Sequence, residues 1–180
     1  PWTTLRRGGV CFQIGDRVST IPSFPMGQYG VYGESAIVPA SAATKYPDTL
    51  TAPEGAAIWM QYMTAFGALI EYGNLKEGDA VLITAASSSV GLAAIQIVKA
   101  TGGIAIATTR GANKKAFLLE AGADLVIVTD EEDLVERGMS LTAGKGARVV
   151  FDPVAGPLLE QLAAVTAEGG IIFEYGALAP

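Results

Sequence analysis

Histidine is absent from the 180-residue sequence, and cysteine occurs once, as Cys11. Without histidine, the chain has no imidazole to act as a general base, to activate a serine or cysteine nucleophile, or to bind a metal. One cysteine can form neither an intrachain disulfide nor a four-cysteine zinc site, which suits the reducing cytoplasm. No activating group flanks Cys11, so we expect an inert small residue. We therefore expect that a bound cofactor carries any chemistry.

Positive charge is also scarce, because 12 Lys and Arg oppose 18 Asp and Glu, for a net charge of −6. Such a chain has no general positive field, so we expect neither nucleic acid nor a membrane surface as a partner. The most apolar stretch, residues 90–107, is interrupted by polar residues and glycines and predicts no membrane span. Residues 1–7 lead into no apolar segment, so we expect no signal peptide. A cytoplasmic protein is the expectation.

What the sequence does contain is a repeated unit, a short β-branched run followed by a turn and a helical segment. Five runs start near residues 80, 104, 125, 148 and 171, at spacings of 24, 21, 23 and 23 residues. Each run is continuously apolar, as in strands buried on both faces, and each gap is long enough for a crossover helix. The sequence therefore predicts an α/β fold with a doubly wound parallel sheet of five strands.

Helix signals agree with this repeat. Asn113 is a candidate cap for a helix over 114–121, and Pro157 opens a helix that should end before Gly169. Upstream, Thr51 and Glu54 have the spacing of a capping box, which predicts a helical stretch over 53–72 that is interrupted once.

Residues 1–50 differ from the rest in having only strand and loop signals. Strands are expected at 15–18 and 33–38, around a turn-rich segment at 22–28. Fifty residues bury too little surface to be stable alone, so we interpret 1–50 as the remnant of a β-rich domain, and 51–180 as the domain with the parallel sheet.

The first strand runs into a turn of small residues, 84–91, and a helix follows with apolar residues at Val90, Ala94, Ile97 and Val98. This order places free helix amides and the positive end of the helix dipole at the carboxyl ends of the strands, where a pyrophosphate can bind. The alternative is that Ser87, Ser88 and Ser89 only cap the helix, since the G-x-G-x-x-G motif is absent.

Several motifs together resemble those of the medium-chain dehydrogenase/reductases, in the quinone-oxidoreductase-like branch. They lie at 15–18, 29–41, 64–69, 78–102, 118–124, 151–156 and 169–178. The resemblance implies a Rossmann-like cofactor domain, truncated at its carboxyl end, after the end of a GroES-like catalytic domain. It also implies a full-length homodimer, and a sixth strand and catalytic segments outside these 180 residues, so we expect the chain alone to be inactive.

Two departures from the family pattern stand out. Ser88 and Ser89 replace the usual pair of glycines, and their Cβ atoms would crowd the closest approach to a pyrophosphate. Met60 stands where the zinc enzymes have a cysteine ligand, and 19–34 replaces their structural zinc lobe. No metal site is therefore expected.

The second strand ends at Arg110, 19 residues past Gly91, where an NAD-binding unit usually has an acid. Arginine there, with Lys114 opening the next helix, favours NADP over NAD, because both can bind a 2′-phosphate. The alternative is a solvated basic helix start. Together with the resemblance, this gives the candidate cofactor-binding residues: Thr64, Ala86, Ser87, Ser88, Ser89, Val90, Gly91, Thr109, Arg110, Lys114, Tyr175, Gly176, Ala177 and Leu178.

The resemblance implies a zinc-independent, NADPH-dependent reductase of a quinone, an enone or a similar carbonyl. The alternatives are a zinc-dependent alcohol dehydrogenase with ligands outside this chain, and a non-catalytic NADPH-binding module. Tyr62 and Phe66 have the spacing of core aromatics on one helix face, and Asp152 is either a turn cap or a cofactor contact. We identify no catalytic residue.

Overall fold

A computed structural model describes residues 6–7, 10–25 and 27–179. Residues 1–5 and Met26, which belong to the sequence segments discussed above, lie outside the described residues, as does the side chain of Cys11. The chain divides into two compact units, Pro1–Met60 and Gln61–Pro180.

The first unit contains two small antiparallel sheets. Strand β1 (Arg6–Arg7) pairs with β2 (Val10–Cys11), and β3 (Val18–Thr20) pairs with β4 (Ala43–Lys45), which follows the 3-10 helix η1 (Ala40–Ala42). The predicted strand at 15–18 overlaps β3 only at Val18. The predicted strand at 33–38 is wrong, because these residues pair with no strand among the described residues, and the side chain of Ile37 is 78% exposed.

Helix α1 (Ala52–Phe66) begins at the predicted capping box. The backbone N–H of Thr51 donates to Glu54 Oε2 at 2.7 Å, and the N–H of Glu54 donates to Thr51 Oγ1 at 3.4 Å. The hydrogen bonds to Thr51 also lower the pKa of the Glu54 carboxyl. The predicted interruption is a change of hydrogen-bonding pattern, since α1 continues as a π-helical segment, η2 (Gly67–Tyr72).

The second unit contains the predicted parallel sheet. Its strands, in the order β7-β6-β5-β8-β9, are all parallel. The bounds are β5 (Ala80–Ile83), β6 (Ile104–Thr109), β7 (Leu125–Val128), β8 (Ala147–Asp152) and β9 (Thr166–Glu174). The four helices between them are α2 (Ser89–Ala100), α3 (Lys115–Glu120, after the 3-10 helix η3, Ala112–Lys114), α4 (Leu134–Leu141) and α5 (Leu158–Val165). The doubly wound α/β fold is confirmed.

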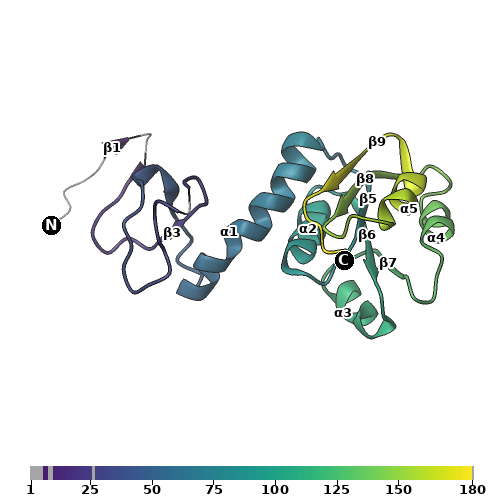
Figure 1. Ribbon diagram of the computed structural model, residues 1–180, viewed down its shortest axis with the longest axis horizontal. Helices are drawn as coiled ribbons and strands as arrows, with labels where there is room; N and C mark the ends of the chain where they lie inside the picture. Colours follow the sequence, from purple (N-terminus) through teal and green to yellow (C-terminus); the bar gives the residue numbers. More distant parts are fainter. Residues whose placement is uncertain (1–5, 8–9, 26, 180) are drawn as a thin grey trace. The chain divides into compact units, whose positions relative to one another are not determined.

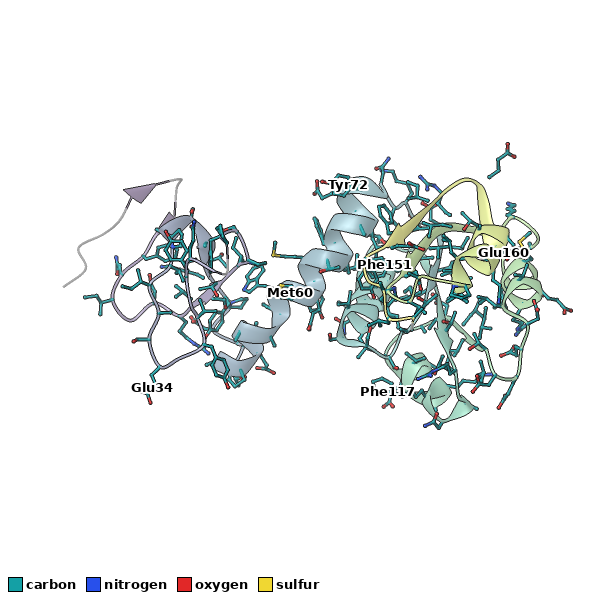
Figure 2. All side chains as sticks on the ribbon, viewed as in Figure 1. Glu34, Met60, Tyr72, Phe117, Phe151 and Glu160 are labelled. Atoms are coloured by element: carbon teal, nitrogen blue, oxygen red, sulfur yellow. The ribbon has the colours of Figure 1, made fainter. Side chains whose placement is uncertain are left out.

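Helices cover both faces of this sheet. Figure 1 shows α2 and α3 on one side of the sheet and α4 and α5 on the other. Each side has its own apolar core, built around Ile95 and Phe151 on the first and around Leu82 and Leu162 on the second. The apolar runs of β5, β6, β7 and β8 are therefore strands buried on two faces, whereas β9 is half-buried to exposed. Figure 2 shows Phe151 inside this unit, whereas Phe117 lies at its surface and is 48% exposed.

Two details differ from the sequence predictions, the cap of α3 and the start of β9, whereas the helix opened by Pro157 ends before Gly169 as predicted. Asn113 does not cap α3, because it lies within η3 and Lys114 occupies the cap position without a side-chain hydrogen bond. Helix α5 ends at Val165, and β9 already begins at Thr166, with an irregular register opposite Ala147 and Val149. Gly169, with φ +70°, lies within this early part of β9 and accounts for the irregular pairing.

Candidate functional site

The carboxyl ends of the five strands meet at one edge of the sheet, which we call the carboxyl edge. The turn after β5, the loop after β6, the loop after β8 and the end of β9 all leave the sheet there. This edge therefore collects all the predicted site residues except Thr64, which lies half-buried in α1.

The turn after β5 is tight and begins with an unusual backbone conformation. Ala85 has φ 43°, a left-handed conformation that is uncommon for a residue with a Cβ atom. Ser88 is the N-cap of α2, where its Oγ accepts a hydrogen bond from the N–H of Gly91 at 3.1 Å. The capping interpretation is thus correct for Ser88. Gly91 leaves no space for a side chain, because a Cβ atom there would lie 2.6 Å from the oxygen of Ala86.

Ser87 and Ser89 differ from Ser88 in their exposure and hydrogen bonds. Ser87 is half-buried, and its Oγ accepts a hydrogen bond from Lys114 Nζ at 3.2 Å. Ser89 is exposed and begins α2. Among the described residues, the backbone N–H groups of Ser89 and Val90 have no acceptor, so the start of α2 keeps donors available for an anion.

Basic side chains follow the end of β6. Thr109 is buried, and its hydroxyl donates to the oxygen of Gly111 at 3.4 Å. Arg110 is exposed, and within the described part of the chain its guanidinium forms neither a hydrogen bond nor an ion pair. Arg110, which is unpaired among the described residues, therefore follows this strand. Lys114, which is bonded to the turn after β5, follows it as well.

Tyr175 follows the end of β9 and lies near Ser88, in the turn after β5. Its ring stacks on Phe151, with centroids 4.1 Å apart and an angle of 21° between the planes. Its hydroxyl is buried without a hydrogen-bond partner among the described residues. Burial raises the pKa of this phenol to about 12; the charge of Asp152 adds to the rise, and the nearby Ser88 hydroxyl opposes it without forming a hydrogen bond.

The residues after Tyr175 continue along the carboxyl edge. A Cβ atom at Gly176 would lie 2.8 Å from the oxygen of Pro153, so the two loops touch closely at that point. The N–H of Leu178 donates to the same oxygen at 3.0 Å. Ala177 and Leu178 are exposed, and the Leu178 side chain, 69% exposed, is available to a ligand.

Asp152 ends β8 and is fully buried. Its Oδ2 accepts from the N–H of Ala155 at 2.6 Å, so the turn-cap interpretation is correct. Its Oδ1 also accepts from the hydroxyl of Thr84, at the end of the neighbouring strand β5. Thr84 was not among the predicted site residues, although a polar residue at the end of each of two apolar runs was a signal for such a pair.

The two aromatic residues predicted to share a helix face do not share one environment. The hydroxyl of Tyr62 donates to Gln96 Oε1 on α2, and its ring packs against the first core. Phe66, one turn later, is 47% exposed. Tyr62 thus links α1 to α2, whereas Phe66 is not a core residue of the described structure.

Three other features of residues 6–7, 10–25 and 27–179 bear on function. No group of three or more His, Cys, Asp or Glu residues is placed to hold a metal there. None of the helices described has both the length and the apolar character that a bilayer crossing requires. An open cavity of about 330 Å³ follows β7 and is lined by Glu131, Glu132, Asp133, Glu136, Arg137 and Ser140. Its four carboxylates make it unsuitable for a phosphate.

The chain is similar to known dehydrogenases. Residues 89–180 match the zinc-binding dehydrogenase family. The chain is 31% identical over 162 residues to the quinone oxidoreductase-like protein 2 homolog of Nematostella vectensis, covering 90% of this chain and 43% of that protein.

Solved structures give the same result. The quinone oxidoreductase of Escherichia coli, complexed with NADPH, superposes with a TM-score of 0.71 at 33% identity, over 78% of this chain and 44% of that one. The CurK enoyl reductase superposes with a TM-score of 0.70 at 29% identity, over 77% and 42%. The chain therefore spans less than half the length of each of these relatives.

Proposed function

Because the chain belongs to the zinc-binding dehydrogenases, as a quinone-oxidoreductase-like member of the medium-chain dehydrogenase/reductase family, we propose that it is the cofactor-binding part of an NADPH-dependent oxidoreductase. The observation that carries the proposal is the position of Lys114, bonded to Ser87 beside the α2 N-terminus, with Arg110 following β6 at the same carboxyl edge. A helix N-terminus suits a pyrophosphate, and the two cations suit a further phosphate.

The described residues fit this cofactor. The free N–H groups of Ser89 and Val90 would hold the pyrophosphate, and the buried, unpartnered hydroxyl of Tyr175 has a donor to offer at the same turn. Arg110 and Lys114 would bind the 2′-phosphate that distinguishes NADPH from NADH. The Ser88 and Ser89 side chains leave less room for the pyrophosphate to approach the backbone of this turn. We expect them to lower the affinity for NADPH without preventing its binding.

When bound, NADPH supplies the hydride. The chain's own residues bind and orient it. Tyr175, Gly176, Ala177 and Leu178, at the end of β9, and Thr64, on α1, are proposed to flank the nicotinamide half. No residue of the site is suited to act as a general acid, since the phenol of Tyr175, with a pKa of about 12, holds its proton tightly. The role of this chain is therefore positioning and exclusion of water.

The substrate class we propose is a quinone, an enone or a similar carbonyl compound. A quinone oxidoreductase and an enoyl reductase among the similar structures support reduction of conjugated, electron-poor double bonds. We propose that the reaction is independent of zinc, because the chain has no histidine, one cysteine, and Met60 at the position of a ligand in the zinc enzymes. Metal analysis of the complete protein distinguishes this from a zinc-dependent dehydrogenase.

We further propose that 1–50 is the end of a catalytic domain and 51–180 the cofactor domain. The whole protein is proposed to be a cytoplasmic homodimer. We propose no nucleic acid or membrane partner, which the net charge of −6 on these 180 residues supports. Because the chain spans less than half of its relatives, we expect the 180 residues to bind cofactor weakly and to lack turnover.

The test is to titrate NADPH and NADH into the protein, and then to follow NADPH oxidation with a panel of quinones and enones. Tighter binding of NADPH and substrate-dependent oxidation by the complete protein are expected. Binding without any oxidation by the complete protein would favour the non-catalytic module. Turnover by the 180 residues alone at the rate of the complete protein would show that our division between the two domains is wrong.

A further inference from the structure

We propose that Asp152 is a positioning residue that, through Thr84, holds the turn after β5 in the form that accepts the cofactor. The inference rests on the proposed NADPH site and deepens it. Asp152 does not itself meet the cofactor, because it is fully buried and both its carboxylate oxygens are occupied by protein donors.

Asp152 and Thr84 end two neighbouring strands, β8 and β5, and connect three loops of the carboxyl edge. The Thr84 hydroxyl donates to Oδ1, and the Ala155 N–H donates to Oδ2 at 2.6 Å. The backbone oxygen of Asp152 accepts from the N–H of Tyr175 at 2.9 Å. One residue thus fixes the start of the turn after β5, the loop after β8 and the segment after β9.

Two of these loops contain alanines in a left-handed conformation, Ala85 with φ 43° and Ala155 with φ 59°. Residues with a Cβ atom keep such a backbone only where their surroundings impose it, and glycine is the usual residue there. Ala85 directly follows Thr84, and the N–H of Ala155 is bonded to Asp152. The buried carboxylate therefore imposes the backbone at both alanines.

The consequence concerns binding. The turn that starts at Ala85 presents Ser87, the Ser88 cap and the first amides of α2. If this turn is already ordered, NADPH does not have to order it on binding. The free energy of binding is then more favourable by the free energy that ordering the turn would cost. If the Thr84 hydroxyl is removed, a buried carboxylate oxygen loses its donor and the turn is free to rearrange.

The experiment measures NADPH dissociation constants by fluorescence for the whole 180-residue chain and four variants. Thr84→Val removes the hydroxyl and keeps the shape, and Thr84→Ser restores a hydroxyl. Asp152→Asn keeps one oxygen acceptor. Thr101→Val is the matched control, because the Thr101 hydroxyl is bonded to Ile97 and Val98 oxygens at the opposite end of α2. Amide hydrogen exchange of Ser88 and Ala155 is followed without NADPH.

We expect about tenfold weaker NADPH binding by Thr84→Val and Asp152→Asn, near wild-type binding by Thr84→Ser and Thr101→Val, and faster exchange of both amides in Thr84→Val. Unchanged binding by Thr84→Val, or equal weakening by Thr101→Val, would overturn the proposal. If Thr84→Val does not fold, Asp152→Asn decides, and unchanged NADPH binding by that variant would overturn the proposal. If the wild type does not bind NADPH, the proposed function is wrong, and the exchange data alone decide whether Asp152 orders the turn.

Discussion

The ammonium group of Lys114 lies 3.2 Å from the hydroxyl of Ser87, although 27 residues separate them in the chain. The contact joins the loop after β6 to the turn after β5, so the cation stands beside the amides that begin α2. A positive charge fixed there adds to the helix dipole in favouring an anion. This contact connects the turn proposed to hold the pyrophosphate with the loop proposed to bind the 2′-phosphate.

Arg110→Ala should reduce the preference for NADPH over NADH by about tenfold, since a hydrogen bond between charged groups contributes about 1.5–3 kcal/mol. The guanidinium has no partner among the described residues, so its removal should leave folding intact. Dissociation constants for both cofactors measure the effect. Lys145→Ala, also exposed but placed before β8, is the control and should change neither constant. Full retention of the preference by Arg110→Ala would show that another group binds the 2′-phosphate.

Gly91→Ala should destabilise the protein by about 1–3 kcal/mol, because the new Cβ atom would lie 2.6 Å from the backbone oxygen of Ala86. Gly67→Ala is the matched control, since a Cβ atom there meets nothing within 4 Å. Urea denaturation gives both free energies of unfolding. Equal stability of the two variants would mean that the turn relaxes freely around residue 91.

Much of the fold was predictable because its signals are local. Five continuous apolar runs predicted the parallel sheet, and Thr51 with Glu54 predicted the start of α1. The predicted strand at 33–38 failed for the opposite reason. Its pattern resembles a strand, but a strand forms only where a partner edge exists, and local sequence does not reveal the partner.

The same limit applies to the site. The order of strand, turn and helix placed Ser88 correctly at the start of α2. The bond between Thr84 and Asp152 spans 68 residues, and the contact of Tyr175 with Phe151 depends on the pairing of β9 with β8. Such contacts follow from strand order in the sheet, which the spacing of the runs does not determine.

Tyr175 should make stability depend on pH in the alkaline range. Its pKa is about 12 in the folded protein, against 10.0 for an ordinary tyrosine. Between pH 10 and 12 the unfolded chain therefore loses this proton while the folded protein keeps it, so the stabilisation present below pH 10 is lost as pH rises. The free energy of unfolding of the wild type should fall relative to that of Tyr175→Phe over this range. If the free energies of unfolding of the two proteins changed equally with pH over this range, the raised pKa of Tyr175 would be contradicted.

Zinc should be absent from the purified chain. It has no histidine and one cysteine, and carboxylates alone seldom form a zinc site. Elemental analysis after purification without metal chelation is the measurement, with a member of the family that binds zinc as the positive control. A value near one zinc per chain would refute zinc independence for this protein.

The most direct test of the central claim is to map NADPH binding residue by residue, using backbone amide chemical shifts of the 180-residue chain. We predict that the largest shifts on adding NADPH fall on Ser87–Gly91, Arg110 and Lys114, and that NADH shifts Arg110 and Lys114 less. Shifts confined to other regions, such as the acidic cavity after β7 or the first unit, would contradict a cofactor site at the carboxyl edge of the sheet.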